Sequence, residues 1–103
     1  MLEQIFTRLP ELFIADSVKA PISFYFSLDD VKKTVLLAPS GCTVQDGRTV
    51  DEADCVCKTS KEFFKKIWDD GYRPGMKDFF SGTIKSNNPN ALQTFLLSFG
   101  KVA

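Results

Sequence analysis

Histidine is absent from the 103 residues of this chain. Because histidine is the usual general base near neutral pH, its absence removes the commonest form of acid–base catalysis. A carboxylate would replace it only if it were buried, and the candidates are Asp16, Asp54 and Asp70. The sequence also lacks the glycine-rich loops that bind phosphate groups. We therefore expect no catalytic residues and a protein that is not an enzyme.

Cysteine is scarce, with three residues in all. An odd number would leave one thiol unpaired in an oxidising compartment, and a structural zinc site usually needs four cysteine or histidine ligands. Cys55 and Cys57 stand two positions apart on one expected strand, which is poor geometry for a disulfide. We therefore expect buried free thiols, no metal site, no cofactor and a cytoplasmic location.

Net charge and long apolar runs are lacking as well. The 13 basic and 13 acidic residues cancel, which argues against a nucleic-acid partner because such proteins present a basic face. No apolar run approaches the roughly 18 residues of a membrane span, and the first residues lack the basic start and apolar core of a signal peptide.

The charges are unevenly distributed along the chain. Between Lys58 and Lys85 there are seven basic residues and four acidic ones. Arg73 and Lys77 in this segment are candidates for contact with a ligand headgroup, and the segment as a whole for transient contact with a membrane surface. An ordinary solvated surface is the alternative.

Apolar residues make up 44% of the chain and include ten phenylalanines, which at this length predicts one domain, residues 1–103. The first segment has helical spacing, and Pro10 should end or kink that helix; the apolar positions are Leu2, Ile5, Phe6 and Leu9. From Ile22 the period changes to two, as in a strand with one buried face. We expect an antiparallel meander of four short strands, at residues 22–27, 34–38, 42–45 and 53–58.

The last third of the chain predicts helices. Thr59 and Glu62 have the spacing of a capping box, and Gly71 should end the helix that they begin. A shorter helix should run from Pro74 to Phe80, followed by a fifth strand at residues 83–86. Pro89 suits the first turn of a final helix with a continuous apolar stripe.

Five short motifs, in this order and spacing, resemble the sterol carrier protein type 2 domain. They are Leu9-Pro10-Glu11-Leu12-Phe13, Ala53-Asp54-Cys55, Ser60-Lys61-Glu62-Phe63, Phe79-Phe80-Ser81-Gly82-Thr83-Ile84-Lys85 and the apolar terminal helix. Thr83 stands where that family usually has lysine, and Asn88 stands in place of a usual glycine. The chain therefore resembles a divergent member over nearly its whole length.

The resemblance implies a fold and a function. We expect an α+β fold in which a five-stranded, mostly antiparallel sheet carries helices on one face and encloses an apolar tunnel. Members of the family bind sterols, fatty acids, fatty acyl thioesters or similar lipids without catalysis and transfer or present them. The expected partner is thus a hydrophobic small molecule. We expect a monomer, with a dimer as the alternative.

Eight large apolar side chains are the candidates for the ligand-binding tunnel wall: Phe64, Trp68, Phe79, Phe80, Leu92, Phe95, Leu96 and Phe99. An apolar site holds a lipid chain by burial and needs few polar groups. Ordinary core packing is the alternative for each residue. The terminal helix from Pro89 to Gly100 is too short to be stable alone and is expected to be a mobile lid. A second hypothesis is a protein–protein or dimerisation module that uses the apolar stripe of this helix.

Overall fold

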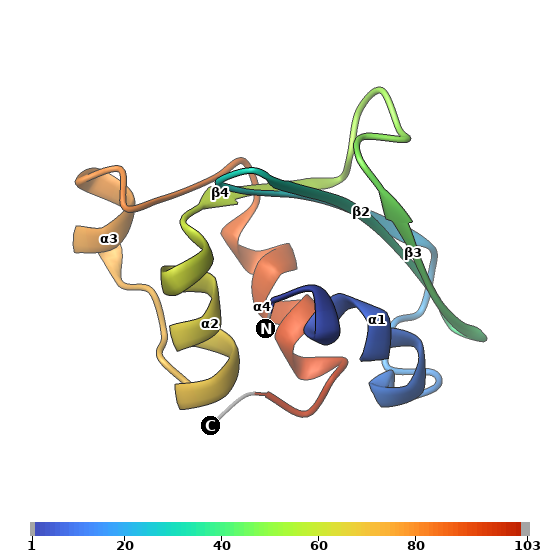
Figure 1. Ribbon diagram of the computed structural model, residues 1–103. Helices are drawn as coiled ribbons and strands as arrows, with labels where there is room; N and C mark the ends of the chain where they lie inside the picture. The colour runs from blue at the N-terminus through green and yellow to red at the C-terminus, as the bar shows by residue number, and fades with distance from the viewer. Residues whose placement is uncertain (1, 102–103) are drawn as a thin grey trace.

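A five-stranded sheet with helices on one face makes up the fold (Figure 1). The computed structural model describes residues 2–101, with Leu2 described by its backbone alone. The elements run in the order α1 (Leu2–Leu12), β1 (Ile22–Leu28), β2 (Val31–Ala38), β3 (Gly41–Asp46), β4 (Cys55–Thr59), α2 (Lys61–Asp70), α3 (Met76–Phe80), β5 (Ile84–Ser86) and α4 (Pro89–Leu97). The predicted α+β class, the five strands and the placement of the helices are confirmed. Within residues 2–101, no helix is both long and apolar enough to cross a membrane.

The strand order is β3-β2-β1-β4-β5, and β4 runs parallel to β1 while every other neighbouring pair is antiparallel. The predicted four-strand meander is therefore wrong at its last step. Residues 47–54 do not close a hairpin after β3. They cross the side of the sheet away from the helices, as Figure 1 shows, and deliver β4 to the far edge of β1.

Side chains on the outer face of the sheet hold this crossing segment in place. Thr34 donates a hydrogen bond to the carbonyl of Gly47 at 2.7 Å and accepts one from the amide of Thr49 at 3.1 Å. The guanidinium of Arg48 lies 5.4 Å from the centre of the Tyr25 ring. Thr34 and Tyr25 are buried in consequence, so both faces of the central strands are covered.

Alternation along β1 and β2 directs the apolar side chains toward the helices. Phe24, Phe26 and Val35 on this face have no exposed surface. Lys33 shares the face and is 8% exposed. Its ammonium pairs with the carboxylates of Asp46 and Glu3, the latter at 2.7 Å. These two hydrogen bonds raise the pKa of Lys33 and connect α1 to the sheet.

The helix boundaries follow local chemistry with some departures from prediction. α1 continues through Pro10 to Leu12, because the ring lies on the exposed side and the amide of Phe13 still bonds to the carbonyl of Leu9 at 3.0 Å. The N-cap of α2 is Ser60, whose hydroxyl accepts from the amide of Phe63, and Thr59 instead ends β4.

The end of α2 and the start of α4 agree with prediction, whereas α3 begins at Met76 instead of Pro74 and α4 ends at Leu97 instead of Gly100. Gly71 ends α2 with φ 69°, a conformation that glycine adopts at little cost. Asn88 caps α4, and Pro89 occupies its first turn. The predicted place of Leu2 on the apolar face of α1 lies outside the side chains that the structure describes.

Candidate functional site

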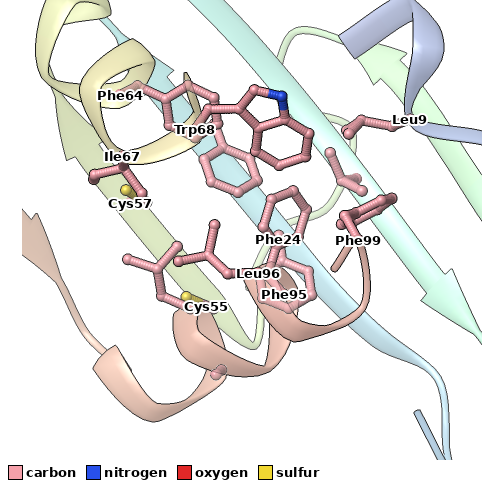
Figure 2. Packing of buried hydrophobic residues seen from close by; sticks show 14 of the residues in the cluster. Leu9, Phe24, Cys55, Cys57, Phe64, Ile67, Trp68, Phe95, Leu96 and Phe99 are labelled. Carbon is pink, nitrogen blue, oxygen red and sulfur yellow. The ribbon is translucent and has the colours of Figure 1, made fainter. Parts of the chain in front are cut away.

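A cluster of aromatic rings fills the space between the sheet and the helices (Figure 2). We call it the aromatic cluster: Phe6 of α1, Phe24 and Phe26 of β1, Phe64 and Trp68 of α2, Phe95 of α4 and Phe99 just beyond α4. The ring of Phe95 lies 5.1 Å from that of Phe24 and 4.9 Å from that of Phe26, measured between centroids. None of the seven rings is more than 6% exposed.

The expected tunnel is not seen in this interior. Phe26 lies 5.6 Å from Phe6 and 5.5 Å from Phe64, and Trp68 lies 5.7 Å from Phe99, again between centroids. These are the usual distances of packed aromatic pairs. The rings therefore occupy the space that we expected to be open, because an empty apolar void forfeits dispersion contacts on every side.

One pocket opens at the surface between α4 and the segment that joins α2 to α3. This α3–α4 pocket has a volume of about 290 Å³. Its walls are mainly apolar, with contributions from Tyr72, Pro74, Phe79, Leu92 and Leu96. Leu92 and Leu96 also pack in the core with the rings, so the floor of the pocket is continuous with the aromatic cluster.

A second, wider depression lies between α1 and α2. This α1–α2 cleft has a volume of about 800 Å³ and a rim of mixed charge that includes Arg8, Lys65 and Asp69. Trp68 forms part of its floor, and Lys101 lines both this cleft and the α3–α4 pocket. The ammonium of Lys101 lies 4.9 Å from the centre of the indole ring. Its charged rim makes the cleft less suitable for an alkyl chain than the α3–α4 pocket.

The eight predicted site residues separate into three groups. Phe64, Phe95 and Phe99 lie in the aromatic cluster, and Trp68 lies at its edge in the α1–α2 cleft. Three members line the α3–α4 pocket: Phe79, Leu92 and Leu96.

Phe80 departs from the prediction, because its side chain is 82% exposed and lies on the outer surface of α3. Sequence reasoning missed Tyr72, Pro74 and Lys101, which line the pocket from irregular segments. These positions lie outside the periodic helices and strands that indicate an apolar wall. Arg73, expected from its charge to contact a ligand headgroup, does line the pocket.

The terminal helix packs against the core of the domain. Ala91, Leu92, Phe95 and Leu96 of α4 are buried, and Phe95 contacts rings from β1 and α2. One side of α4 thus packs into the core while Asn90, Gln93 and Leu97 on the other side are exposed, and the expected mobility of this helix stays a prediction. Its apolar stripe also faces the body of the domain and is not presented to a partner.

A hydrogen-bonded loop holds α3 beside the pocket. The carboxylate of Asp78 accepts from the hydroxyl of Tyr72 at 2.7 Å and from the amide of Gly75 at 2.8 Å. The Gly75 amide, followed by the Tyr72 hydroxyl, lowers the pKa of Asp78, and the same carboxylate raises the pKa of Tyr72. The ammonium of Lys66 lies 4.3 Å from the centre of the Tyr72 ring. These contacts fix the wall of the pocket that Tyr72 and Phe79 share.

The cysteines have the character of buried apolar residues. Cys55 and Cys57 are buried and Cys42 is half-buried, all three as free thiols. Burial raises the pKa of Cys57 to about 12 and that of Cys42 to about 11, so both are protonated at neutral pH. Among residues 2–101, no group of three or more histidine, cysteine or acidic side chains is placed to hold a metal ion.

The carboxylates considered as catalytic bases are not buried. Asp16, Asp54 and Asp70 are all exposed. Asp54 accepts hydrogen bonds from the amide and hydroxyl of Ser23, at 2.9 and 3.3 Å, which fixes the start of β4 against β1. None of the three therefore has the enclosed position expected of a catalytic carboxylate.

Comparison with solved structures defines the fold. The chain superposes on the ubiquinone synthesis protein UbiJ-SCP2 with a TM-score of 0.69 and 13% identity, covering 96% of this chain and 92% of that protein. It superposes on the apo form of sterol carrier protein 2 from Yarrowia lipolytica with a TM-score of 0.59 and 18% identity, covering 94% and 85%. No family profile matches the chain, and no curated protein sequence does.

A larger enzyme contains a similar unit. The inverting sec-alkylsulfatase Pisa1 from Pseudomonas sp. superposes with a TM-score of 0.76 and 17% identity, covering 99% of this chain. The chain spans only 16% of the sulfatase. Together these likenesses define an α+β fold and nothing more, because the identities lie between 13% and 18%. The particular fold is that of the sterol carrier protein type 2 domain, as the sequence motifs predicted.

Proposed function

We propose that this protein binds a hydrophobic ligand, such as a sterol, fatty acid or fatty acyl thioester, and transfers or presents it without catalysis. The observation that carries the proposal is the α3–α4 pocket. It opens at the surface, and its floor, formed by Leu92 and Leu96, continues into the aromatic cluster. Two basic side chains, Arg73 and Lys101, also line the pocket and could contact a polar headgroup, while an apolar chain would meet Phe79, Leu92 and Leu96.

The volume of the pocket indicates how a lipid would fit. About 290 Å³ is at the lower limit of the 300–1,000 Å³ or so that small-molecule sites usually occupy. The pocket therefore accommodates one part of a lipid, and the remainder would displace rings of the aromatic cluster. Phe64, Trp68, Phe95 and Phe99 are proposed to contact the ligand in that expanded state, and Phe79, Leu92 and Leu96 in the pocket itself.

The position of α4 favours this proposal over a protein–protein module. The module hypothesis needs the apolar stripe of α4 on the surface, whereas Phe95 and Leu96 are buried in the same domain. We propose a monomer formed by one domain, residues 1–103. The three free thiols support a reducing location such as the cytoplasm.

Titration of the tryptophan emission with a soluble fatty acid tests the proposal. Trp68 is the sole tryptophan of the chain and touches the rings of Phe64, Phe95 and Phe99, so ligand entry should change its emission saturably. Native mass spectrometry of the protein purified from cells should in addition detect a bound lipid. The absence of both a saturable change and a bound lipid would reject the proposal.

Two matched variants test where a fatty acid enters the domain. Gln93 is exposed at the α3–α4 pocket and Gln4 is exposed at the α1–α2 cleft. Gln93→Phe should narrow the pocket and weaken fatty-acid binding about tenfold, because the added ring competes with the ligand for the same apolar wall. Gln4→Phe should leave binding near that of the unmodified protein. The opposite result would move the entrance to the α1–α2 cleft.

A further inference from the structure

Exposed apolar side chains are concentrated on α3. Among residues 2–101, the large apolar side chains that are exposed are Ile14 at 49%, Met76 at 73%, Phe80 at 82% and Leu97 at 54%. The two most exposed both belong to α3 and stand four residues apart, which places them on the same side of the helix. They thus form one small apolar face.

The rest of the fold does not account for this face. α3 contains no buried residue, and Figure 1 shows it at one side of the domain, away from α1. Phe79 turns toward the pocket, while Asp78 is held by Tyr72 and Gly75. Phe79 and Asp78 therefore hold the inner side of the helix against the domain, and Met76 and Phe80 point outward.

Basic residues lie close to the apolar face in the sequence. Residues 71–86 contain Arg73, Lys77 and Lys85 and a single acidic residue, Asp78, so their net charge is 3 − 1 = +2. Lys77 and Lys85 are exposed. The one carboxylate points back to its two hydrogen-bond donors, which leaves the outward side of α3 positive. Apolar residues bordered by lysine are typical of surfaces that enter the headgroup layer of an anionic membrane.

We propose that α3 docks on an anionic lipid bilayer, with Met76 and Phe80 inserted among the headgroups and Lys77 and Lys85 against lipid phosphates. A protein partner fits the surface less well, because a stable protein interface buries more than about 1,000 Å² of matched surface and α3 has five residues. A bilayer needs no shape complementarity, so a few inserted side chains with nearby positive charge are sufficient for reversible binding.

The docked orientation has a consequence for ligand transfer. Phe79 lines the α3–α4 pocket and is adjacent in the chain to Phe80. Docking through α3 would therefore place the mouth of the pocket close to the bilayer. This consequence rests on the proposed ligand binding, whereas the docking itself does not.

Sedimentation with lipid vesicles tests the docking. The full chain should sediment with vesicles of phosphatidylcholine and phosphatidylserine and much less with phosphatidylcholine alone, and added salt should release it. The double variant Met76→Ser/Phe80→Ser should bind the anionic vesicles at least about tenfold more weakly, because two apolar side chains are lost from the interface. Lys77→Glu/Lys85→Glu should remove the preference for phosphatidylserine.

The matched control is Ile14→Ser/Leu97→Ser, which removes the other two exposed apolar side chains and should bind the vesicles like the unmodified protein. Thermal unfolding confirms that each variant is folded. Equal vesicle binding by the α3 variant and the unmodified protein would overturn the docking, as would no vesicle binding by the unmodified protein. Fatty-acid binding is followed separately through Trp68, so failure of that assay with vesicle binding intact would reject the proposed function and leave the docking standing.

Discussion

Phe79 and Phe80 are neighbours in the chain and have different surroundings. Phe79 is half-buried against the α3–α4 pocket, while Phe80 is 82% exposed. Consecutive helical residues point about 100° apart, so one of two neighbouring side chains can face inward while the other faces solvent. The two were grouped in sequence because a five-residue helix shows too few turns to define its buried face.

Truncation of Phe95 should lower the free energy of unfolding much more than truncation of Phe80. Phe95→Ala removes a fully buried ring that contacts Phe24, Phe26, Trp68 and Phe99, and should lower the free energy of unfolding by about 3–5 kcal/mol. Phe80→Ala should change it by less than about 0.5 kcal/mol, as is usual for exposed positions. Urea unfolding measures both. Similar losses for the two variants would show that α3 packs against the domain more closely than its exposure indicates.

The segment that joins α2 to α3 owes its shape to one carboxylate. Asp78 accepts from Tyr72 and from Gly75, and these contacts hold both the pocket wall and the outward face of α3. Caps and turns of this kind depend on specific side-chain to backbone hydrogen bonds. The sequence indicated a break at Gly71 and a helix after Pro74, but it did not indicate that Asp78 would tie the two together.

Removal of the Asp78 carboxylate should loosen α3 selectively. Asp78→Ala should speed amide hydrogen exchange in residues 72–80 and leave exchange in β1 and β2 unchanged, because the sheet does not use this contact. Tyr72→Phe, which removes one of the two donors and keeps the ring, should have a smaller effect. Equal exchange in α3 of the variant and of the unmodified protein would show that Phe79 alone anchors the helix.

Lowering the pH should loosen α3 in the same way as Asp78→Ala. Since the folded state holds the pKa of Asp78 below its ordinary value of 3.8, the contribution of this group is fully present above that value. It is lost as the pH falls through the lowered pKa. Exchange in α3 should therefore accelerate below about pH 4 in the unmodified protein, and Asp78→Ala should lack this step.

At the scale of the whole molecule, most elements could be predicted and one connection could not. Period and turn residues located each strand and helix to within a few positions, because these features depend on neighbours in the chain. The pairing of β4 with β1 depends instead on residues 47–54 crossing the sheet, where Thr34 and Tyr25 receive them. Asp46-Gly47 has the composition of a hairpin turn, and the long-range contacts override that local preference.

The close packing of the interior also depends on contacts between residues far apart in the chain. The family resemblance implied an apolar tunnel, and eight large apolar side chains were expected to line it. The structure shows the rings packed on each other, with Phe95 between the sheet and Trp68. Volume is set by how the rings meet in three dimensions, which composition alone does not determine. The proposed ligand-bound state therefore requires a rearrangement of this packing.

The kinetics of binding should show that rearrangement. If rings of the aromatic cluster must separate before a lipid chain can pass the α3–α4 pocket, the binding-competent state is a minor population that the ligand selects. In stopped-flow measurements of Trp68 emission, the observed rate constant should level off as the fatty-acid concentration rises, at a limit set by opening of the cluster. Phe64→Leu replaces one ring of the closed packing with a smaller side chain and should raise that limit. A rate constant that increases linearly toward about 10⁸ M⁻¹s⁻¹ would contradict this expectation, because it would mean that an open site already exists in the unliganded protein.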